Sequence, residues 1–144
     1  MSRPKSTEEI EYFLNDKLKV ELGNLENALN KSNQDVMEYI QLEKTIEFIK
    51  TNKSDGFKTQ IDVGTNMFME ASVDKIEPIL INVGLNVYLE LSIEEALKFL
   101  GQKIKILNKE SEVIREESLK VRAEIKILLM YLAERKGFAP SEIF

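Results

Sequence analysis

Residues 61–70 have the sequence IDVGTNMFME, and residues 81–90 repeat it as INVGLNVYLE. In and around both copies, apolar side chains alternate with other residues at a period of two, which is typical of β-strands. Each copy also has a glycine at its centre, where one strand must reverse into the next. The repeat therefore predicts two similar β-hairpins, at about residues 57–73 and 79–91, joined by residues 74–78.

The glycine of each copy indicates how the strands are connected. Because glycine at the first position of a two-residue loop is typical of a type II′ turn, we predict that Gly64 and Gly84 begin such loops. A two-stranded sheet with an apolar face is marginally stable alone and has open edges. We therefore expect the hairpins to assemble with other chains; the alternative is that they fold back onto the ends of the flanking helices. The candidate assembly residues are Ile61, Val63, Gly64, Met67, Phe68, Met69, Ile79, Ile81, Val83, Gly84, Leu85, Val87, Tyr88 and Leu89.

The segment after the hairpins predicts one long helix over about residues 93–136. Ser92 and Glu95 have the spacing of a capping box, and Gly137 follows the last basic turn. An apolar stripe with spacings of four and three in strict alternation runs between these signals, which indicates a left-handed coiled coil with another helix. Its positions are Ile93, Leu97, Leu100, Ile104, Leu107, Ser111, Ile114, Ser118, Val121, Ile125, Leu128 and Leu132.

The segment before the hairpins predicts a second long helix, over about residues 7–53. Ser6 and Glu9 form its capping box, and Ser54-Asp55-Gly56 is its exit turn. The stretch from Gly23 to Tyr39 contains several poor helix formers, so we expect a bend or looser packing there. The apolar positions are Ile10, Leu14, Leu18, Leu22, Leu25, Leu29, Val36, Tyr39, Leu42, Ile46 and Ile49.

The two helices are well matched in length, at about 70 and 66 Å for a rise of about 1.5 Å per residue. We therefore predict an α+β, mainly α fold: one domain over residues 1–144 with an antiparallel two-helix coiled coil joined by two hairpins. Self-dimerisation of the helices is the alternative that the heptads alone permit.

The composition excludes several classes of function. The 144 residues include 0 His and 0 Cys, which removes imidazole and thiol catalysis and nearly every zinc site. The isolated glycines form no phosphate-binding loop, so we expect no enzyme activity, cofactor or metal. The net charge of -5 is spread along the chain, which argues against direct nucleic-acid binding. No apolar run is long enough for a membrane span, and residues 1–9 lack the apolar core of a secretory signal, so we expect a cytoplasmic or nuclear protein.

The order of helix, two hairpins and helix, with LELSIEEALKF at residues 89–99, resembles the α-class prefoldin subunits over essentially the whole chain. Within that class, residues 59–64 and 88–99 are most similar to one prefoldin-like subtype. Gly84-Leu85-Asn86 replaces the glycine-rich turn of the conventional α subunits. The resemblance implies a hetero-oligomer of two α-class and four β-class subunits, in which the second α-class subunit of the prefoldin-like complex is of the URI type.

The resemblance also implies a function. Prefoldins hold unfolded client proteins at the distal ends of their coiled coils, without ATP. In this chain the residues that take this role by resemblance are Ile10, Tyr12, Phe13, Leu129, Met130 and Tyr131. A chaperone subunit is therefore the expected function. The alternatives are a scaffold or transcriptional co-regulator that uses the same fold as an adaptor, and a conventional prefoldin α subunit.

Overall fold

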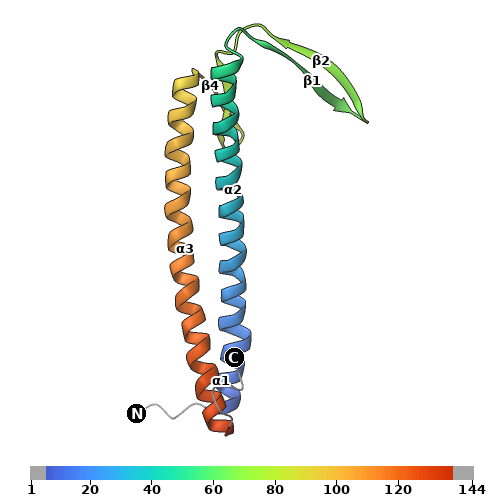
Figure 1. Ribbon diagram of the computed structural model, residues 1–144. Helices are drawn as coiled ribbons and strands as arrows, with labels where there is room; N and C mark the ends of the chain where they lie inside the picture. The colour runs from blue at the N-terminus through green and yellow to red at the C-terminus, as the bar shows by residue number, and fades with distance from the viewer. Residues whose placement is uncertain (1–5, 138–144) are drawn as a thin grey trace. The chain divides into compact units, whose positions relative to one another are not determined.

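The computed structural model describes residues 6–137, which form a helix, two hairpins and a second helix in the predicted order (Figure 1). The first helix comprises α1 (Thr7–Phe13), a π-helical turn η1 (Leu14–Leu18) and α2 (Lys19–Asn52). The strands are β1 (Phe57–Gly64), β2 (Met67–Val73), β3 (Ile79–Gly84) and β4 (Val87–Leu91), and the last helix is α3 (Ile93–Lys136). The predicted fold class is confirmed. The predicted domain covers residues 1–144, and both of its ends lie outside the described residues. The same holds for most of residues 1–9, which were expected to lack a secretory signal.

Both long helices begin at the predicted capping boxes. The Glu9 N–H donates to Ser6 Oγ at 3.2 Å, and the Ser6 N–H donates to Glu9 Oε2 at 3.1 Å. Ser92 and Glu95 make the same pair of hydrogen bonds at the start of α3, at 3.2 and 2.9 Å. These contacts satisfy backbone donors that the first helical turn leaves without partners, so they fix where each helix begins.

The described chain divides into two compact units that share the helices. The first unit combines residues up to Gln34 with residues from Leu107 onward, and the second unit is Asp35–Ile106. Both boundaries fall inside a helix, within α2 and within α3, so no linker separates the units.

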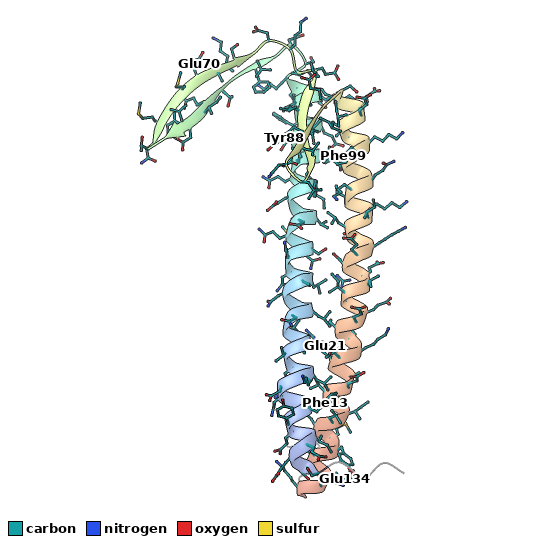
Figure 2. The ribbon with its side chains drawn as sticks, turned by 180° about the vertical axis from the view of Figure 1, so that it is seen from behind. Phe13, Glu21, Glu70, Tyr88, Phe99 and Glu134 are labelled. Carbon is teal, nitrogen blue, oxygen red and sulfur yellow. The ribbon has the colours of Figure 1, made fainter. Side chains whose placement is uncertain are left out.

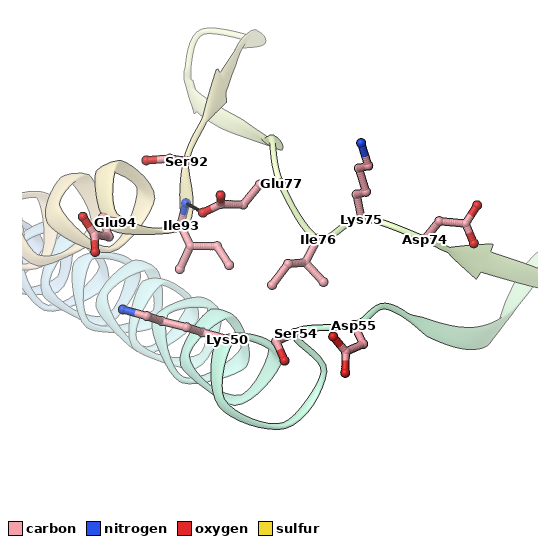
Figure 3. Close-up of a pocket in the computed structure, with 10 residues that line it drawn as sticks. All are labelled: Lys50, Ser54, Asp55, Asp74, Lys75, Ile76, Glu77, Ser92, Ile93 and Glu94. Atoms are coloured by element: carbon pink, nitrogen blue, oxygen red, sulfur yellow. Dashed lines mark hydrogen bonds between the residues drawn. The ribbon is translucent and has the colours of Figure 1, made fainter.

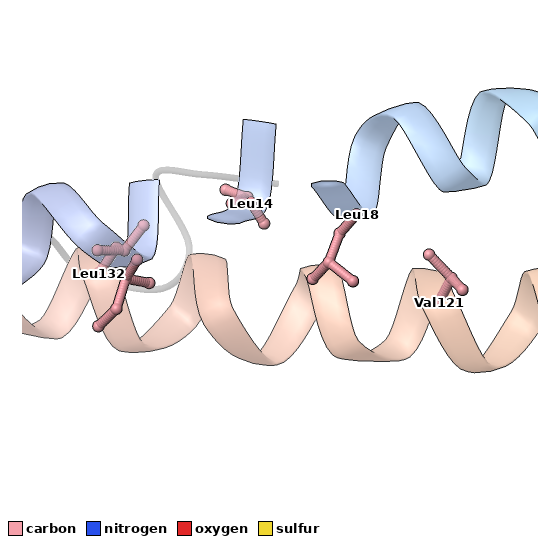
Figure 4. Close-up of a cluster of buried hydrophobic side chains, with 5 residues drawn as sticks. Leu14, Leu18, Val121 and Leu132 are labelled. Atoms are coloured by element: carbon pink, nitrogen blue, oxygen red, sulfur yellow. The ribbon is translucent and has the colours of Figure 1, made fainter. Parts of the chain in front are cut away.

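The first unit has its core between the N-terminal helix and α3. Its buried cluster is formed by Ile10, Leu14 and Leu18 on one side and by Val121 and Leu132 on the other (Figure 4). All five side chains are at positions of the predicted stripes. Burial of such side chains contributes about 1.5–3 kcal/mol each, so this cluster is the main source of stability in the unit.

Polar contacts show that the helices of the first unit are antiparallel. Glu11 pairs with Lys136 near the start of α1, and Glu26 pairs with Arg122 further along. A buried hydrogen bond of 2.7 Å then joins the hydroxyls of Ser32 and Ser111. Partners on α3 come progressively earlier as the N-terminal helix advances, which is the predicted antiparallel arrangement within this unit.

The α3 stripe is confirmed, because all twelve of its predicted positions are buried or half-buried. The N-terminal stripe differs at two places. Leu42 is 38% exposed and lies outside the seam. After Val36 and Tyr39, the alternating spacing of three and four places the next seam position at Glu43, which is half-buried. Ser32 is buried within the seam, although its polarity hid it from the apolar pattern.

The predicted irregularity between Gly23 and Tyr39 does not interrupt the helix, because α2 is a continuous α-helix from Lys19 to Asn52. The helix departs from α geometry at η1 instead. Residues Ile10, Leu14, Leu18 and Leu22 are spaced by four, and in an α-helix each such step rotates the side chain by about 40° away from the seam. The wider π turn offsets this rotation, so that Leu14 and Leu18 are both buried.

The hairpins have the predicted strands but a different turn. Gly64 pairs with Met67 after a bulge, and the two loop residues, Thr65 and Asn66, have φ values of 49° and 58°. Positive φ at both loop positions defines a type I′ turn, so the predicted type II′ turn is wrong. Gly64 belongs to the bulge before the turn, where its φ is 103° and its N–H donates to Asp62 Oδ1 at 2.8 Å.

The second hairpin has the same construction. Gly84 pairs with Val87 after an equivalent bulge, and its N–H donates to Asn82 Oδ1 at 3.0 Å. Leu85 and Asn86 form the loop, with φ values of 50° and 58°. The sequence repeat is therefore also a repeat of backbone structure.

The core of the second unit lies where β3 meets the helices. The buried side chains are Ile46 of α2, Ile81 of β3, and Ile93, Ala96 and Leu100 of α3. The alternative prediction, in which hairpin residues pack on the helix ends, is thus correct for part of the second hairpin.

Candidate interaction surfaces

The first hairpin exposes an apolar face. Ile61 lies opposite Met69 in the strand register, and Phe57 lies opposite Val73. The other face is mainly polar and carries an ion pair between Lys58 and Glu70 at 3.3 Å. Because successive residues of a strand point to opposite faces, the sequence alternation places the apolar side chains together on one side.

The two hairpins differ in how far this face is covered. Ile81 is 4% exposed, whereas Ile61, at the matching position of the repeat, is 50% exposed. Of the predicted assembly residues, Ile79 and Val83 are half-buried beside Ile81, and the others are exposed; Tyr88 is labelled on β4 in Figure 2. We call the exposed apolar residues of the two hairpins the hairpin surface: Ile61, Val63, Met67, Phe68, Met69, Leu80, Leu85, Val87, Tyr88 and Leu89.

A second exposed surface lies where α1 begins and α3 ends. Tyr12 is 61% exposed, and Phe13, Met130 and Tyr131 are also exposed (Phe13 is labelled in Figure 2). The guanidinium of Arg135 lies 5.0 Å from the centre of the Tyr131 ring, within the range of a cation–π contact. These aromatic and methionine side chains exceed what one interhelical seam buries.

Two residues predicted at this surface are less exposed than the others, and one exposed apolar residue of the last turns of α3 was not predicted. Ile10 is buried in the interhelical core, and Leu129 is half-buried against that core. Ile127 is 65% exposed and was not predicted, although its place between the seam positions Ile125 and Leu128 is a sequence signal for exposure. We call Tyr12, Phe13, Ile127, Met130 and Tyr131 the helix-tip surface.

A polar pocket of about 850 Å³ lies beside the start of α3 (Figure 3). Within it Glu77 Oε1 accepts a hydrogen bond from the Ile93 N–H at 2.8 Å, which adds to the capping of α3. The charged residues that line the pocket are all exposed, whereas catalytic carboxylates and lysines usually need partial desolvation. The hydrogen bond between Ile93 and Glu77 links residues 74–78 to the start of α3. Its lining residues are Lys50, Ser54, Asp55, Asp74, Lys75, Ile76, Glu77, Ser92, Ile93 and Glu94.

An apolar pocket of about 390 Å³ lies between α2 and β3, and the sequence patterns did not predict it. Leu42, which lies outside the seam, lines it. The pocket forms only because β3 folds back on α2, a tertiary contact that no local pattern specifies. Its other lining residues are Thr45, Ile46, Ile49, Phe57, Val73, Lys75, Ile76, Pro78, Ile79, Leu80, Ile81 and Asn82.

Within residues 6–137, no three Asp or Glu side chains come together as metal ligands. None of the helices in the described part of the chain is both long and apolar enough to cross a membrane.

Comparisons with known proteins bear on the identity of the fold. The family described as prefoldin subunit matches residues 18–137. A chain in the cryo-EM structure of filamentous PFD from Methanocaldococcus jannaschii is similar in fold, with a TM-score of 0.65 and 25% sequence identity; the match covers 78% of this chain and 92% of that chain.

Similar relatives extend the match in sequence. Protein UXT of Homo sapiens is 31% identical over 127 residues, which cover 88% of this chain and 81% of that protein. The Protein UXT homolog of Dictyostelium discoideum is 29% identical over 126 residues, covering 88% and 78%. The subtype that residues 59–64 and 88–99 resemble is the UXT type, and these relatives confirm that resemblance. The chain belongs to the prefoldin family.

Proposed function

We propose that this chain is a non-enzymatic subunit of a prefoldin-like chaperone or co-chaperone complex. It joins β-class subunits and a second α-class subunit of the URI type through its hairpin surface. It holds unfolded client proteins with its helix-tip surface, in the cytoplasm and the nucleus. The proposal rests first on the hairpin surface, because exposed apolar side chains gathered in this number on two hairpins mark an interaction site.

Assembly is tested by comparing the chain alone with the chain co-expressed with β-class prefoldin subunits. Alone, we expect ill-defined oligomers at high concentration, because the hairpin surface has no specific cover. With the partners we expect a hexamer of about 100 kDa, given 16.6 kDa for this chain and similar masses for the others. A stable, well-behaved monomer or homodimer of the chain alone, measured by light scattering, would contradict assembly through the hairpins.

Client binding is tested at the helix-tip surface with the assembled complex. Replacing Tyr12, Phe13 and Met130 together by serine removes exposed apolar area without touching the buried core. A loss of about 1.4 kcal/mol in client contact corresponds to about tenfold weaker binding. We therefore expect suppression of client aggregation to require a higher concentration of the assembled complex. The matched control is Val113→Ser, which removes a similarly exposed apolar side chain from the middle of α3.

The same experiment separates the chaperone from the adaptor. If the triple variant assembles normally and suppresses aggregation as well as the control, the chain acts as a scaffold or transcriptional adaptor.

The composition of the complex is tested by a pull-down from native extract. Recovery of a URI-type subunit supports the UXT-type complex, and recovery of the conventional second subunit class alone supports a conventional prefoldin α subunit.

A further inference from the structure

A small groove lies between the two helices of the first unit, beside the π turn η1. Its volume of about 290 Å³ is at the lower limit of small-molecule sites, so the groove suits side chains better than a metabolite. Its floor is apolar, because Leu14 and Leu132 belong to the buried cluster of Figure 4 and Ala133 is 3% exposed. Leu129 also lines the groove and is half-buried.

The end of α3 has a geometry that favours packing of the next residue on this groove. Gly137 has a φ of 77°, in the left-handed region, and its N–H donates to the Glu134 carbonyl oxygen at 3.2 Å. Both are features of the Schellman motif, with Gly137 as the first residue beyond the cap. In that motif the following residue, here Phe138, frequently packs on the side chains at the positions of Ala133 or Leu132. Both of these residues line the groove.

The residues that follow α3 have the composition of a segment that binds to an apolar surface. Residues 138–144 have the sequence FAPSEIF and lie outside the described part of the chain. Phe138, Ile143 and Phe144 are large and apolar, and Glu142 is the only charged residue. Pro140 and the residue before it disfavour helical geometry, so these residues favour an extended conformation. Such a segment loses unfavourable contact with water when a neighbouring apolar groove receives it.

The charged side chains of the groove lie at its two ends. Glu11 pairs with Lys136 at the end near Gly137. Lys19 lines the other end and, because the helices are antiparallel, is level with about Leu128 of α3. Within residues 6–137, Lys19 has no carboxylate partner at ion-pair distance. This end of the groove therefore favours a negatively charged group.

The segment is long enough to reach this lysine. The distance back along α3 from Gly137 to the level of Leu128 is about 14 Å, at about 1.5 Å per residue. Five extended residues, 138–142, span about 17 Å. Glu142 therefore comes level with Lys19 when the segment runs back along the groove, and the two charges are opposite.

We propose that residues 138–144 bind along this groove as a strap, which holds the end of α3 against the N-terminal helix. Phe138 packs on Ala133 near the start of the strap, and Glu142 lies beside Lys19 at the other end of the groove. The strap covers the apolar floor and limits fraying of the last turns of α3. The inference is independent of client and subunit binding, because it concerns contacts within one chain.

Disulfide trapping tests the position of the strap. The chain has 0 Cys, so an engineered pair supplies the sole two thiols. Lys19→Cys with Glu142→Cys should form an intramolecular disulfide under mild oxidation at least about tenfold faster than Lys17→Cys with Glu142→Cys, because bridging requires Cα atoms within about 7 Å. Lys17 is the matched control, since it is exposed and close in sequence but does not line the groove. Gel mobility and mass spectrometry of the full chain in dilute solution measure both rates.

Amide hydrogen exchange tests the effect of the strap on the helix. Phe138→Ser removes the apolar contact and should accelerate exchange of residues 132–136 by at least about fivefold. Ser141→Ala changes a polar residue of the same segment and is the matched control. Its exchange rates should stay within about twofold of those of the unaltered chain.

Each other outcome overturns the proposal. Equal trapping rates for the two cysteine pairs would show that the segment does not lie in the groove. Disulfides that form only between two chains would assign the groove to a second copy. If intramolecular trapping fails and an added unfolded protein protects Lys19→Cys from an alkylating reagent, the groove takes clients instead. Unchanged exchange in Phe138→Ser would refute the stabilisation of α3 by the strap.

Discussion

Replacement of Ile81 by alanine should make the second hairpin open from the helices more often, whereas the same change at Ile61 should not. Ile81 is 4% exposed and packs in the core with Ile46 and Leu100. Alanine lacks about three of its carbon atoms, each worth about 0.8 kcal/mol when buried, so the loss is about 2.4 kcal/mol. That loss raises the equilibrium constant for opening of the hairpin by about 50-fold.

The loss of free energy caused by the same substitution at the matched position, Ile61, should be much smaller. Ile61 is 50% exposed, and its partner across the sheet is Met69 of the same hairpin. The same substitution there removes at most about 1 kcal/mol, and only from the first hairpin.

Amide hydrogen exchange of the free chain in dilute solution, followed by mass spectrometry, measures both effects. In the unaltered chain we expect residues 79–91 to exchange more slowly than residues 57–73, because a hairpin without a covered face is marginally stable. Ile81→Ala should accelerate exchange of residues 79–91 by about 50-fold, and Ile61→Ala should leave that segment unchanged. Equal protection of the two hairpins before substitution, or an equal response of residues 79–91 to both substitutions, would refute the reasoning.

Three further predictions concern stability. Ser32→Ala alone should lower the free energy of unfolding by about 1–3 kcal/mol, because it leaves the buried Ser111 hydroxyl without its partner, whereas the double alanine variant should be nearly neutral. A double-mutant cycle of urea unfolding measures this, and additive losses would contradict it. Gly23→Ala should raise stability by about 0.5–1 kcal/mol, since nothing lies within 4 Å of the added Cβ. Gly56→Ala should lower stability by about 1–3 kcal/mol, because the φ of Gly56 is +96° and the added Cβ would lie 2.2 Å from the Val73 carbonyl oxygen. Thermal unfolding compares the Gly23→Ala and Gly56→Ala variants. Equal changes in Tm would contradict both predictions.

The regular parts of the fold could be predicted from sequence because several local signals agree. In α3 the capping residues Ser92 and Glu95, the alternating three and four spacing and the terminal Gly137 all specify the same helix. The strands follow equally well from their alternation. Where one signal was absent the prediction failed, as at Ser32, whose burial depends on a polar partner 79 residues away.

The turn type could not be obtained from the glycine alone. Gly64 is compatible with the first loop position of a type II′ turn and also with the bulge that it occupies. The choice depends on the register of the strands, which places Asn66 rather than Gly64 inside the loop. Asparagine is tolerated at positive φ, so the sequence was consistent with both turns.

The candidate surfaces were predictable only in part, for a physical reason. Matching positions in the two hairpins, such as Ile61 and Ile81, have the same residue and the same neighbours along the chain. Their burial differs because Ile81 packs with Ile46 of α2 and Leu100 of α3, while Ile61 lies outside that core. Coverage of a surface thus depends on tertiary contacts, which a residue pattern does not contain. The same holds for Ile10, which core packing removes from the helix-tip surface.

The hydrogen bond between Ser32 and Ser111 has a consequence for the alignment of the helices. Heptad stripes are self-similar, so sliding α3 by seven residues would bring apolar rows together again. Such a slip in one direction would set Ser111 against Leu25 and leave two buried hydroxyls unpaired, at a cost of about 1–3 kcal/mol each. The hydroxyl pair therefore favours the observed alignment of the two helices over this displaced one.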